Sequence, residues 1–229
     1  MNDIGHKSSL SFRVTSDLGR AIVRGDYGPD RPFPTEAELC LAFGVSRTAV
    51  REAVKMLAAK GLVSSKPRQG IRVLPEESWN IFDPDLLHWS LDSTLTRPLL
   101  KEFFQMRLAI EPEASALAAR VRHGERMRSI GAALDRMTVA PPNSEASRHA
   151  DIDFHVCILY ATENRFYIRM RDFVRTALDV SIRFTSPASR AYSDALAAHT
   201  AVFSAMTAGD AASASVRMRQ LIDDAYSLL

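Results

Sequence analysis

Two helix starts follow one another closely near the N-terminus, and their spacing limits what this part of the chain can fold into. Thr35 and Glu38 are spaced as in a capping box, which predicts a short helix over residues 36–43. Gly44 can end that helix, and Ser46 can cap the next one. Two helices joined by so short a turn are typical of a helix-turn-helix.

The flanking segments extend this pattern to a winged helix-turn-helix of three helices and a β-hairpin. Residues 10–24 predict an amphipathic first helix, because one apolar stripe at helical spacing contains Leu10, Val14, Leu18 and Ile22. The third helix keeps its apolar positions on one face and ends at Gly61. Beyond it, residues 62–75 contain two short β-rich runs around a turn with proline, glycine and basic residues, which predicts the wing.

The third helix carries a basic face opposite its apolar one. This face contains Arg47, Thr48, Arg51 and Lys55. An arginine in the major groove can bind guanine O6 and N7 together, and basic residues of a wing can reach phosphates or the minor groove. The alternative is an ordinary solvated helix surface, where Lys and Arg at four-residue spacing are common. The short turn and the basic hairpin favour DNA binding.

Charge is distributed unevenly along the 229 residues. Residues 1–75 contain 12 Lys or Arg and 7 Asp or Glu, and the remainder contains 17 and 20, so a basic domain precedes a mildly acidic one although the net charge is only +2. No apolar run approaches the roughly 20 residues that cross a bilayer. The first residues also lack the apolar core of a secretory signal. We therefore expect a cytoplasmic protein without membrane contact.

The rest of the chain predicts an all-α body. We expect residues 76–94 to form a linker with a short docking helix at about residues 84–91, and residues 95–229 to form a bundle of about six helices. No strand pattern occurs beyond the wing. The chain is therefore expected to be mainly α, with a DNA-binding domain at residues 1–75 joined to an all-α helical bundle.

Three polar residues of the bundle have apolar surroundings. Asp151 and His155 lie one helical turn apart, and His199 lies in another apolar helical segment. A carboxylate and two imidazoles that converge inside a bundle can bind a divalent transition metal. The alternatives are a hydrogen-bonded core histidine and a surface pair of Asp and His. The spacing alone leaves these interpretations open.

The N-terminal domain resembles a known family. The stretch PTEAELCLAFGVSRTAVREAVKMLAAKGLV, followed by a glycine in the wing, is similar to the winged-helix domain of the GntR family of bacterial transcription regulators. This resemblance covers residues 10–75. It implies that Arg47 and Arg51 contact the operator, and that the wing tip around Arg68 and Gly70 enters the minor groove.

The body is similar to the FCD domain of the FadR branch of this family. That resemblance implies a metal site in which an Asp and a His one turn apart are joined by two later histidines. Asp151 and His155 match the first two positions and His199 matches the third, whereas the fourth falls on Leu221. The resemblance therefore implies a divalent metal with three protein ligands and open coordination positions, zinc being the first choice and nickel or manganese the alternatives.

The same resemblance implies a pocket for an anionic effector. Arg107 corresponds to an arginine that contacts the effector in such domains, and its guanidinium could bind a carboxylate. Glu111, one turn on, could accept hydrogen bonds from effector hydroxyls, and Arg183 is a further candidate. The alternative for Arg107 and Glu111 is a plain ion pair between the two.

Together these features predict a DNA-binding transcription regulator, a repressor, rather than an enzyme. We expect a homodimer that binds a palindromic operator on double-stranded DNA and is released by a small carboxylate effector. The effector is expected to be a sugar acid such as galactonate, with lactate, glucuronate or a similar acid as the alternative. The rival class is a metalloenzyme that uses the Asp151, His155 and His199 site with a general base such as Glu111. An enzymatic function would not explain the basic winged helix-turn-helix domain.

Overall fold

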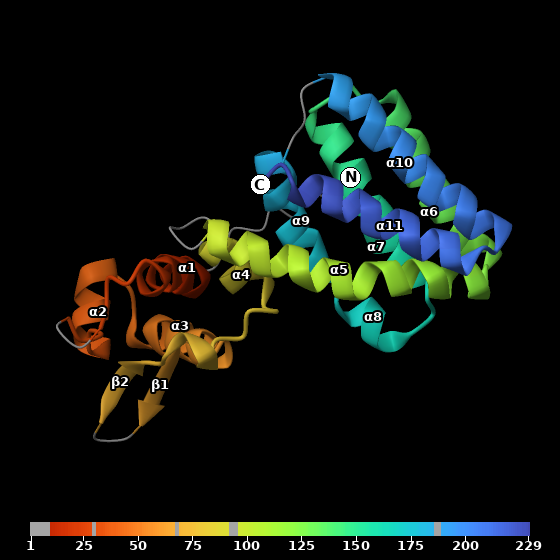
Figure 1. Ribbon diagram of the computed structural model, residues 1–229. Helices are drawn as coiled ribbons and strands as arrows, with labels where there is room; N and C mark the ends of the chain where they lie inside the picture. Colours follow the sequence, from red (N-terminus) through yellow and green to blue (C-terminus); the bar gives the residue numbers. More distant parts are fainter. Residues whose placement is uncertain (1–9, 29–30, 67–68, 92–95, 186–188) are drawn as a thin grey trace, which may run out of the picture. The chain divides into compact units, whose positions relative to one another are not determined.

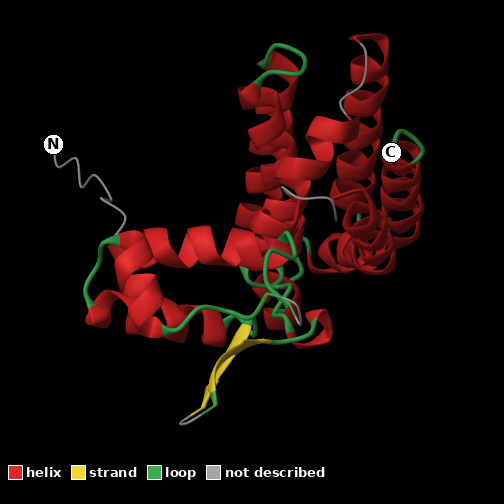
Figure 2. Ribbon diagram, turned by 90° about the vertical axis from the view of Figure 1, so that its left-hand side faces the viewer, coloured by secondary structure: helices red, strands yellow, loops and turns green. Residues whose placement is uncertain are grey.

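The computed structural model describes residues 10–28, 31–66, 69–91, 96–185 and 189–229. The chain divides into two compact units, Met1–Thr94 and Leu95–Leu229. Figures 1 and 2 show one short β-hairpin in the first unit and helices alone in the described part of the second. The predicted fold class, a winged helix-turn-helix followed by an all-α domain, is therefore confirmed. Among the described helices, none combines the length and the apolar character that a membrane crossing requires.

The first unit consists of three helices and an antiparallel hairpin. Its elements are α1 (Leu10–Val23), α2 (Glu36–Phe43), α3 (Arg47–Ala59), β1 (Val63–Lys66) and β2 (Gly70–Val73). The helices pack together through the buried side chains of Leu18, Leu39 and Leu57, one from each helix. In the hairpin Ser64 lies opposite Arg72. This packing fixes α3, whose other face stays in solvent.

Local capping explains where α2 and α3 begin. Glu38 donates its backbone N–H to the hydroxyl of Thr35, and the backbone N–H of Thr35 donates to the Glu38 carboxylate at 2.8 Å, which completes the predicted capping box. Gly44 then adopts a left-handed conformation with φ of 63°. The hydroxyl of Ser46 accepts a hydrogen bond from the backbone of Ala49 and starts α3. The turn that orients α3 is thus fixed by adjacent residues.

The segment after the wing packs on the winged-helix unit. It contains the short 3-10 helix η1 (Glu76–Ser78) and the helix α4 (Pro84–Leu91). The buried Trp89 ring of α4 lies so close to Gly19 of α1 that any added Cβ at Gly19 would collide with it. Lys60 reaches Asp83 at 2.7 Å and Asp85 at 2.8 Å, which ties the start of α4 to the end of α3.

The second unit is a bundle in which the described residues form seven helices. These are α5 (Thr96–Val121), α6 (Gly124–Val139), α7 (Glu145–Ala161), α8 (Arg165–Arg169), α9 (Arg171–Thr185), α10 (Ser189–Ala208) and α11 (Ala211–Tyr226). Helix α7 lies against α5, α6 and α9, and its Phe154 and Ile158 are fully buried. Ser144 and Asp210 cap α7 and α11 through their side chains. The position of α7 brings one of its faces toward the interior of the bundle, where the site described next is found.

Candidate functional site

The predicted DNA-binding face of α3 is exposed in the structure. Arg47, Thr48, Arg51 and Lys55 are all exposed. Arg51 lies 3.0 Å from Glu36 of α2, and Lys55 lies 2.8 Å from Glu52. Exposed ion pairs of this kind contribute about 0 to 1 kcal/mol, so contacts with DNA can replace them. The face is therefore available for a polyanion.

The wing contains the other two residues predicted to contact DNA, Arg68 and Gly70. Gly70 begins β2 opposite Lys66 and has a φ of 74°, a left-handed conformation that glycine adopts without strain. Arg68, the other predicted wing residue, lies outside the described residues. The hairpin geometry thus accounts for the glycine at residue 70.

The predicted metal ligands meet in the second unit. Asp151 and His155 come from α7 and His199 from α10, and one ligand atom from each lies within 4.8 Å of the others. Oδ1 of Asp151 is 3.3 Å from Nε2 of His155 and 3.4 Å from Nε2 of His199. The side chains of His155 and His199 are 3% and 4% exposed, and that of Asp151 is 24% exposed. The cluster is a carboxylate between two imidazole nitrogens, a set that could hold a metal ion.

His199 carries the clearest indication of a missing partner. Its Nδ1 lies 2.7 Å from the carbonyl oxygen of Ala195, and because a carbonyl only accepts, Nδ1 bears the hydrogen. Nε2 of His199 is buried, and it neither donates nor accepts a hydrogen bond within the described part of the chain. A buried nitrogen without a partner is costly. A proton or a metal ion on Nε2 would pair it with Asp151, so the residues present fit a metal.

His155 is oriented by a carboxylate on its other side. Its Nδ1 lies 2.6 Å from Oε2 of Glu111 on α5, and both side chains are buried. A carboxylate accepts, so Nδ1 bears the hydrogen and Nε2 faces Asp151 with its lone pair when the ring is neutral. An outer carboxylate that fixes a histidine in this way is typical of metal sites.

Electrostatics in the cluster favour charged groups. Burial alone would raise the pKa of Glu111, but Arg107 and His155 outweigh burial and lower the pKa to about 2. Burial would likewise raise the pKa of Asp151, and the imidazoles of His199 and His155 instead lower it well below its usual range. The pKa of His155 is raised, because Glu111 and the bond to Asp151 outweigh the opposing effects of burial and Arg107. A cation in this cluster is therefore favoured.

Arg107 is part of the same buried network. Its Nε donates to Oε1 of Glu111 at 2.6 Å, so the ion pair that the sequence left as an alternative is present. Nη2 lies 3.4 and 3.3 Å from the two ring nitrogens of His155 and 3.4 Å from Glu111. Nη1 donates to none of the described residues. Arg107 thus retains donors, whereas Glu111 is occupied by Arg107 and His155.

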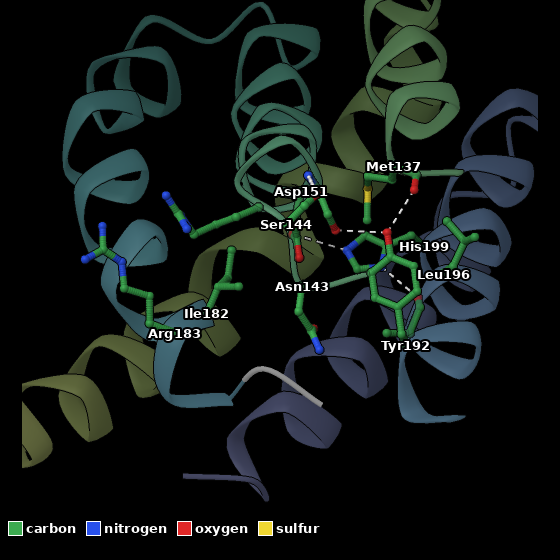
Figure 3. Close-up of a pocket in the computed structure, with 12 residues that line it drawn as sticks. Met137, Asn143, Ser144, Asp151, Ile182, Arg183, Tyr192, Leu196 and His199 are labelled. Atoms are coloured by element: carbon green, nitrogen blue, oxygen red, sulfur yellow. Dashed lines mark hydrogen bonds and ion pairs between the residues drawn. The ribbon is translucent and has the colours of Figure 1, made fainter. Parts of the chain in front are cut away.

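Two cavities meet at the cluster. Their shared wall residues are Asp151, Ile182, Ala195 and His199. The larger cavity, of about 380 Å³, is also lined by Arg107, His155 and Leu221. The smaller cavity, of about 270 Å³, is also lined by Ser147, Arg148, Arg183 and Tyr192, and Figure 3 shows it with Asp151 and His199 directed toward one another.

The cavities separate the predicted effector residues. Arg107 lines the larger cavity and Arg183 the smaller one, while Glu111 lines neither. Leu221 occupies the place where the resemblance implies a fourth histidine, and it lies on the wall of the larger cavity beside the cluster. The structure therefore brings Asp151, His155 and His199 together but does not bring the three effector candidates to one surface.

Sequence reasoning missed Ser147, Arg148 and Tyr192 in the smaller cavity. Ser147 precedes Asp151 by four residues, as Asp151 precedes His155, so helical spacing alone could have placed it on the same face of α7. Tyr192 comes from α10, and no sequence signal connects it to α7. Its hydroxyl lies 2.9 Å from that of Ser147.

Comparison with known proteins agrees with both parts of the fold. Residues 10–73 match the model of bacterial regulatory proteins of the gntR family, and residues 102–224 match the model of the FCD domain. The solved structure of a GntR protein from Streptococcus agalactiae superposes with a TM-score of 0.54 at 20% identity, and the match covers 95% of this chain and 99% of that one. At 20% identity this similarity shows a shared fold and nothing about function.

Two relatives from Escherichia coli strain K12 are more similar in sequence. The uncharacterized HTH-type transcriptional regulator YieP is 37% identical over 162 residues, 70% of both chains. The galactonate operon transcriptional repressor is 35% identical over 152 residues, 66% of both chains, which is slightly less than two thirds. Both relatives are transcription regulators.

Proposed function

Because the chain belongs to the gntR family of bacterial regulatory proteins and carries an FCD domain, we propose that it is a repressor that releases its operator when a small carboxylate effector binds beside a metal in the bundle. Members of this family are transcription regulators and not enzymes. In this proposal residues 1–75 bind DNA, residues 76–94 link the domains, and residues 95–229 bind metal and effector.

Operator binding is assigned to the exposed face of α3. A homodimer would present two such helices to the two halves of a palindromic double-stranded site. Arg47 and Arg51 would contact base edges in the major groove, with Thr48 and Lys55 beside them and the wing at Gly70 toward the minor groove. The proposal is supported by the exposure of all four α3 side chains and by the weak, replaceable ion pair between Arg51 and Glu36.

The metal is assigned to Asp151, His155 and His199. Imidazole and carboxylate ligands suit zinc first, and nickel or manganese would accept the same set. A bound metal would supply positive charge for a carboxylate or hydroxyl of the effector. The observation that carries this assignment is the buried Nε2 of His199, which faces Asp151 without a hydrogen bond.

The effector is assigned to the larger cavity, beside Arg107. The guanidinium retains its Nη1 donors there, and the cavity is large enough for a small ligand. A sugar acid such as galactonate is the first choice, because a relative at 35% identity is the galactonate operon repressor. Lactate, glucuronate or a similar carboxylate would meet the same arginine and is the alternative.

Release of DNA requires an energetic difference between two states. The effector must bind the DNA-free arrangement more tightly than the DNA-bound one. A hundredfold loss of operator affinity needs about 2.7 kcal/mol of coupling between the two sites. By reciprocity, operator DNA must weaken effector binding by the same factor, which a binding titration with and without DNA can measure.

A thermal-shift screen tests the effector assignment. Purified zinc-loaded protein is heated with galactonate, gluconate, glucuronate and lactate, each also tested on Arg107→Lys, which keeps the charge opposite Glu111 but loses the forked donors. The proposal predicts a rise in melting temperature with at least one acid and a smaller rise in the variant. Equal rises in both proteins would contradict the role of Arg107.

A further inference from the structure

The two cavities beside the cluster lie next to each other and share Asp151 and His199 in their walls. Four residues line both of them, so a ligand beside the cluster in the larger cavity has the smaller one adjacent to it. Arg107 stands only in the larger cavity. The smaller cavity is therefore the adjoining space into which the chain of a longer ligand, with its carboxylate at Arg107, could extend.

Hydroxyl groups occupy one wall of the smaller cavity. The Tyr192 hydroxyl donates to the carbonyl oxygen of Met137 at 2.8 Å, so its only hydrogen is used. Ser147, at 2.9 Å, must then donate to the oxygen of Tyr192. Both hydroxyl oxygens keep lone pairs, and this wall can accept hydrogen bonds from ligand hydroxyls.

Guanidinium groups supply donors on another wall. Arg148 of α7 and Arg183 of α9 both bind Asp179, at 2.7 and 2.8 Å. Each arginine has five N–H donors, so the single carboxylate of Asp179 cannot engage all of them, and some remain for a ligand. Figure 3 shows Arg183 on the opposite side of the cavity from Tyr192. A ligand hydroxyl both donates and accepts hydrogen bonds, so it suits a cavity with acceptors on one side and donors on the other.

We propose that the smaller cavity binds the hydroxylated tail of the effector, and that Ser147 and Arg148 there distinguish a six-carbon sugar acid from a two- or three-carbon acid. This inference rests on the proposed function and specifies its ligand class. An apolar tail is disfavoured, because it would leave the donors of Arg148 and the lone pairs of Ser147 without partners.

Calorimetric titration of the zinc-loaded protein with acids of two lengths tests the inference. Glycerate represents the three-carbon acids, and galactonate and gluconate represent the six-carbon ones. The wild type should bind one of the longer acids at least tenfold more tightly than glycerate. Ser147→Ala should weaken the longer acid about threefold to tenfold, the usual effect of one lost hydrogen bond, and leave glycerate within twofold.

A second variant and a control keep the result interpretable. Arg148→Lys retains a charge opposite Asp179 but loses the forked donors, and it should likewise weaken the longer acid alone. Ser129→Ala, on the exposed face of α6, should change neither affinity. Equal binding of short and long acids by the wild type, or equal losses for both acids in Ser147→Ala, would overturn the inference. If no acid of either length binds the wild type, the proposed function fails as well.

Discussion

His155 donates its Nδ1 hydrogen to Glu111 across 2.6 Å, from α7 to α5, in the interior of the bundle. The pair fixes which ring nitrogen of His155 faces Asp151. It also gives Glu111 a role different from the one its sequence position suggested, since the carboxylate orients the His155 ring and lines neither cavity. Arg107 donates to the other carboxylate oxygen at 2.6 Å, so His155 of the cluster and Arg107 share one buried carboxylate.

Glu111→Gln should weaken metal binding about tenfold to a hundredfold, as is typical for loss of an outer-shell carboxylate. The amide keeps the shape of the side chain but removes the charge that holds the Nδ1 hydrogen of His155. Competition with a chromophoric zinc chelator measures the effect. Glu113→Gln, exposed on α5 and paired with Arg120, is the matched control. Equal zinc affinity in both variants would remove Glu111 from the metal site.

His199→Ala should abolish the stabilisation that zinc gives the protein. With zinc at a hundred times its dissociation constant, the wild type should gain about 2.7 kcal/mol of unfolding free energy, measured as a rise in melting temperature. The variant should gain almost none. His149→Ala removes an exposed histidine of α7 and should keep the full gain. A full zinc response in His199→Ala would show that the metal binds elsewhere.

Arg47→Ala and Arg51→Ala should each cost about 1 to 3 kcal/mol of operator binding and leave the melting temperature unchanged. Fluorescence anisotropy with an operator selected by the purified protein from a random-sequence library measures the loss. Arg24→Ala removes an exposed arginine that pairs with Asp26 and should cost much less. Equal losses in all three variants would indicate a nonspecific charge effect in place of contacts with bases.

Gly19→Val should destabilise the winged-helix unit by about 1 to 3 kcal/mol, because the new side chain collides with the Trp89 ring. The midpoint of chemical unfolding measures the change. Gly28→Ala is the control, since, apart from its neighbours in the chain, no atom of the described residues lies within 4 Å of a Cβ at residue 28. An unchanged midpoint in Gly19→Val would mean that α4 does not pack on α1.

The parts of the structure that sequence predicted best are those set by adjacent residues. The capping box of Thr35 and Glu38, the helix end at Gly44 and the cap at Ser46 need only local geometry, and all three are present. Asp151 and His155 could be paired because four residues on a helix bring side chains together. Local rules were therefore enough to predict the winged helix and two of the three cluster residues.

The rest depended on contacts between helices that are distant in sequence. No spacing rule connects Glu111 with His155, which lie on α5 and α7, or Ser147 with Tyr192, which lie on α7 and α10. The division of Arg107 and Arg183 between two cavities likewise follows from the packing of α5 and α9 around α7. Packing decides which polar residues share a cavity, and a helical pattern alone does not contain that information.

In the proposed function an acid bound beside the cluster controls DNA binding, and this can be measured as release of the operator. The zinc-loaded wild type and His199→Ala are each bound to the selected, labelled operator and titrated with galactonate and the other acids of the thermal-shift screen. We predict that at least one acid weakens operator binding of the wild type fivefold or more, and that His199→Ala binds the operator normally but does not respond. Operator binding that no acid changes, or an equal response in the variant, would show that an acid beside the cluster does not control DNA binding.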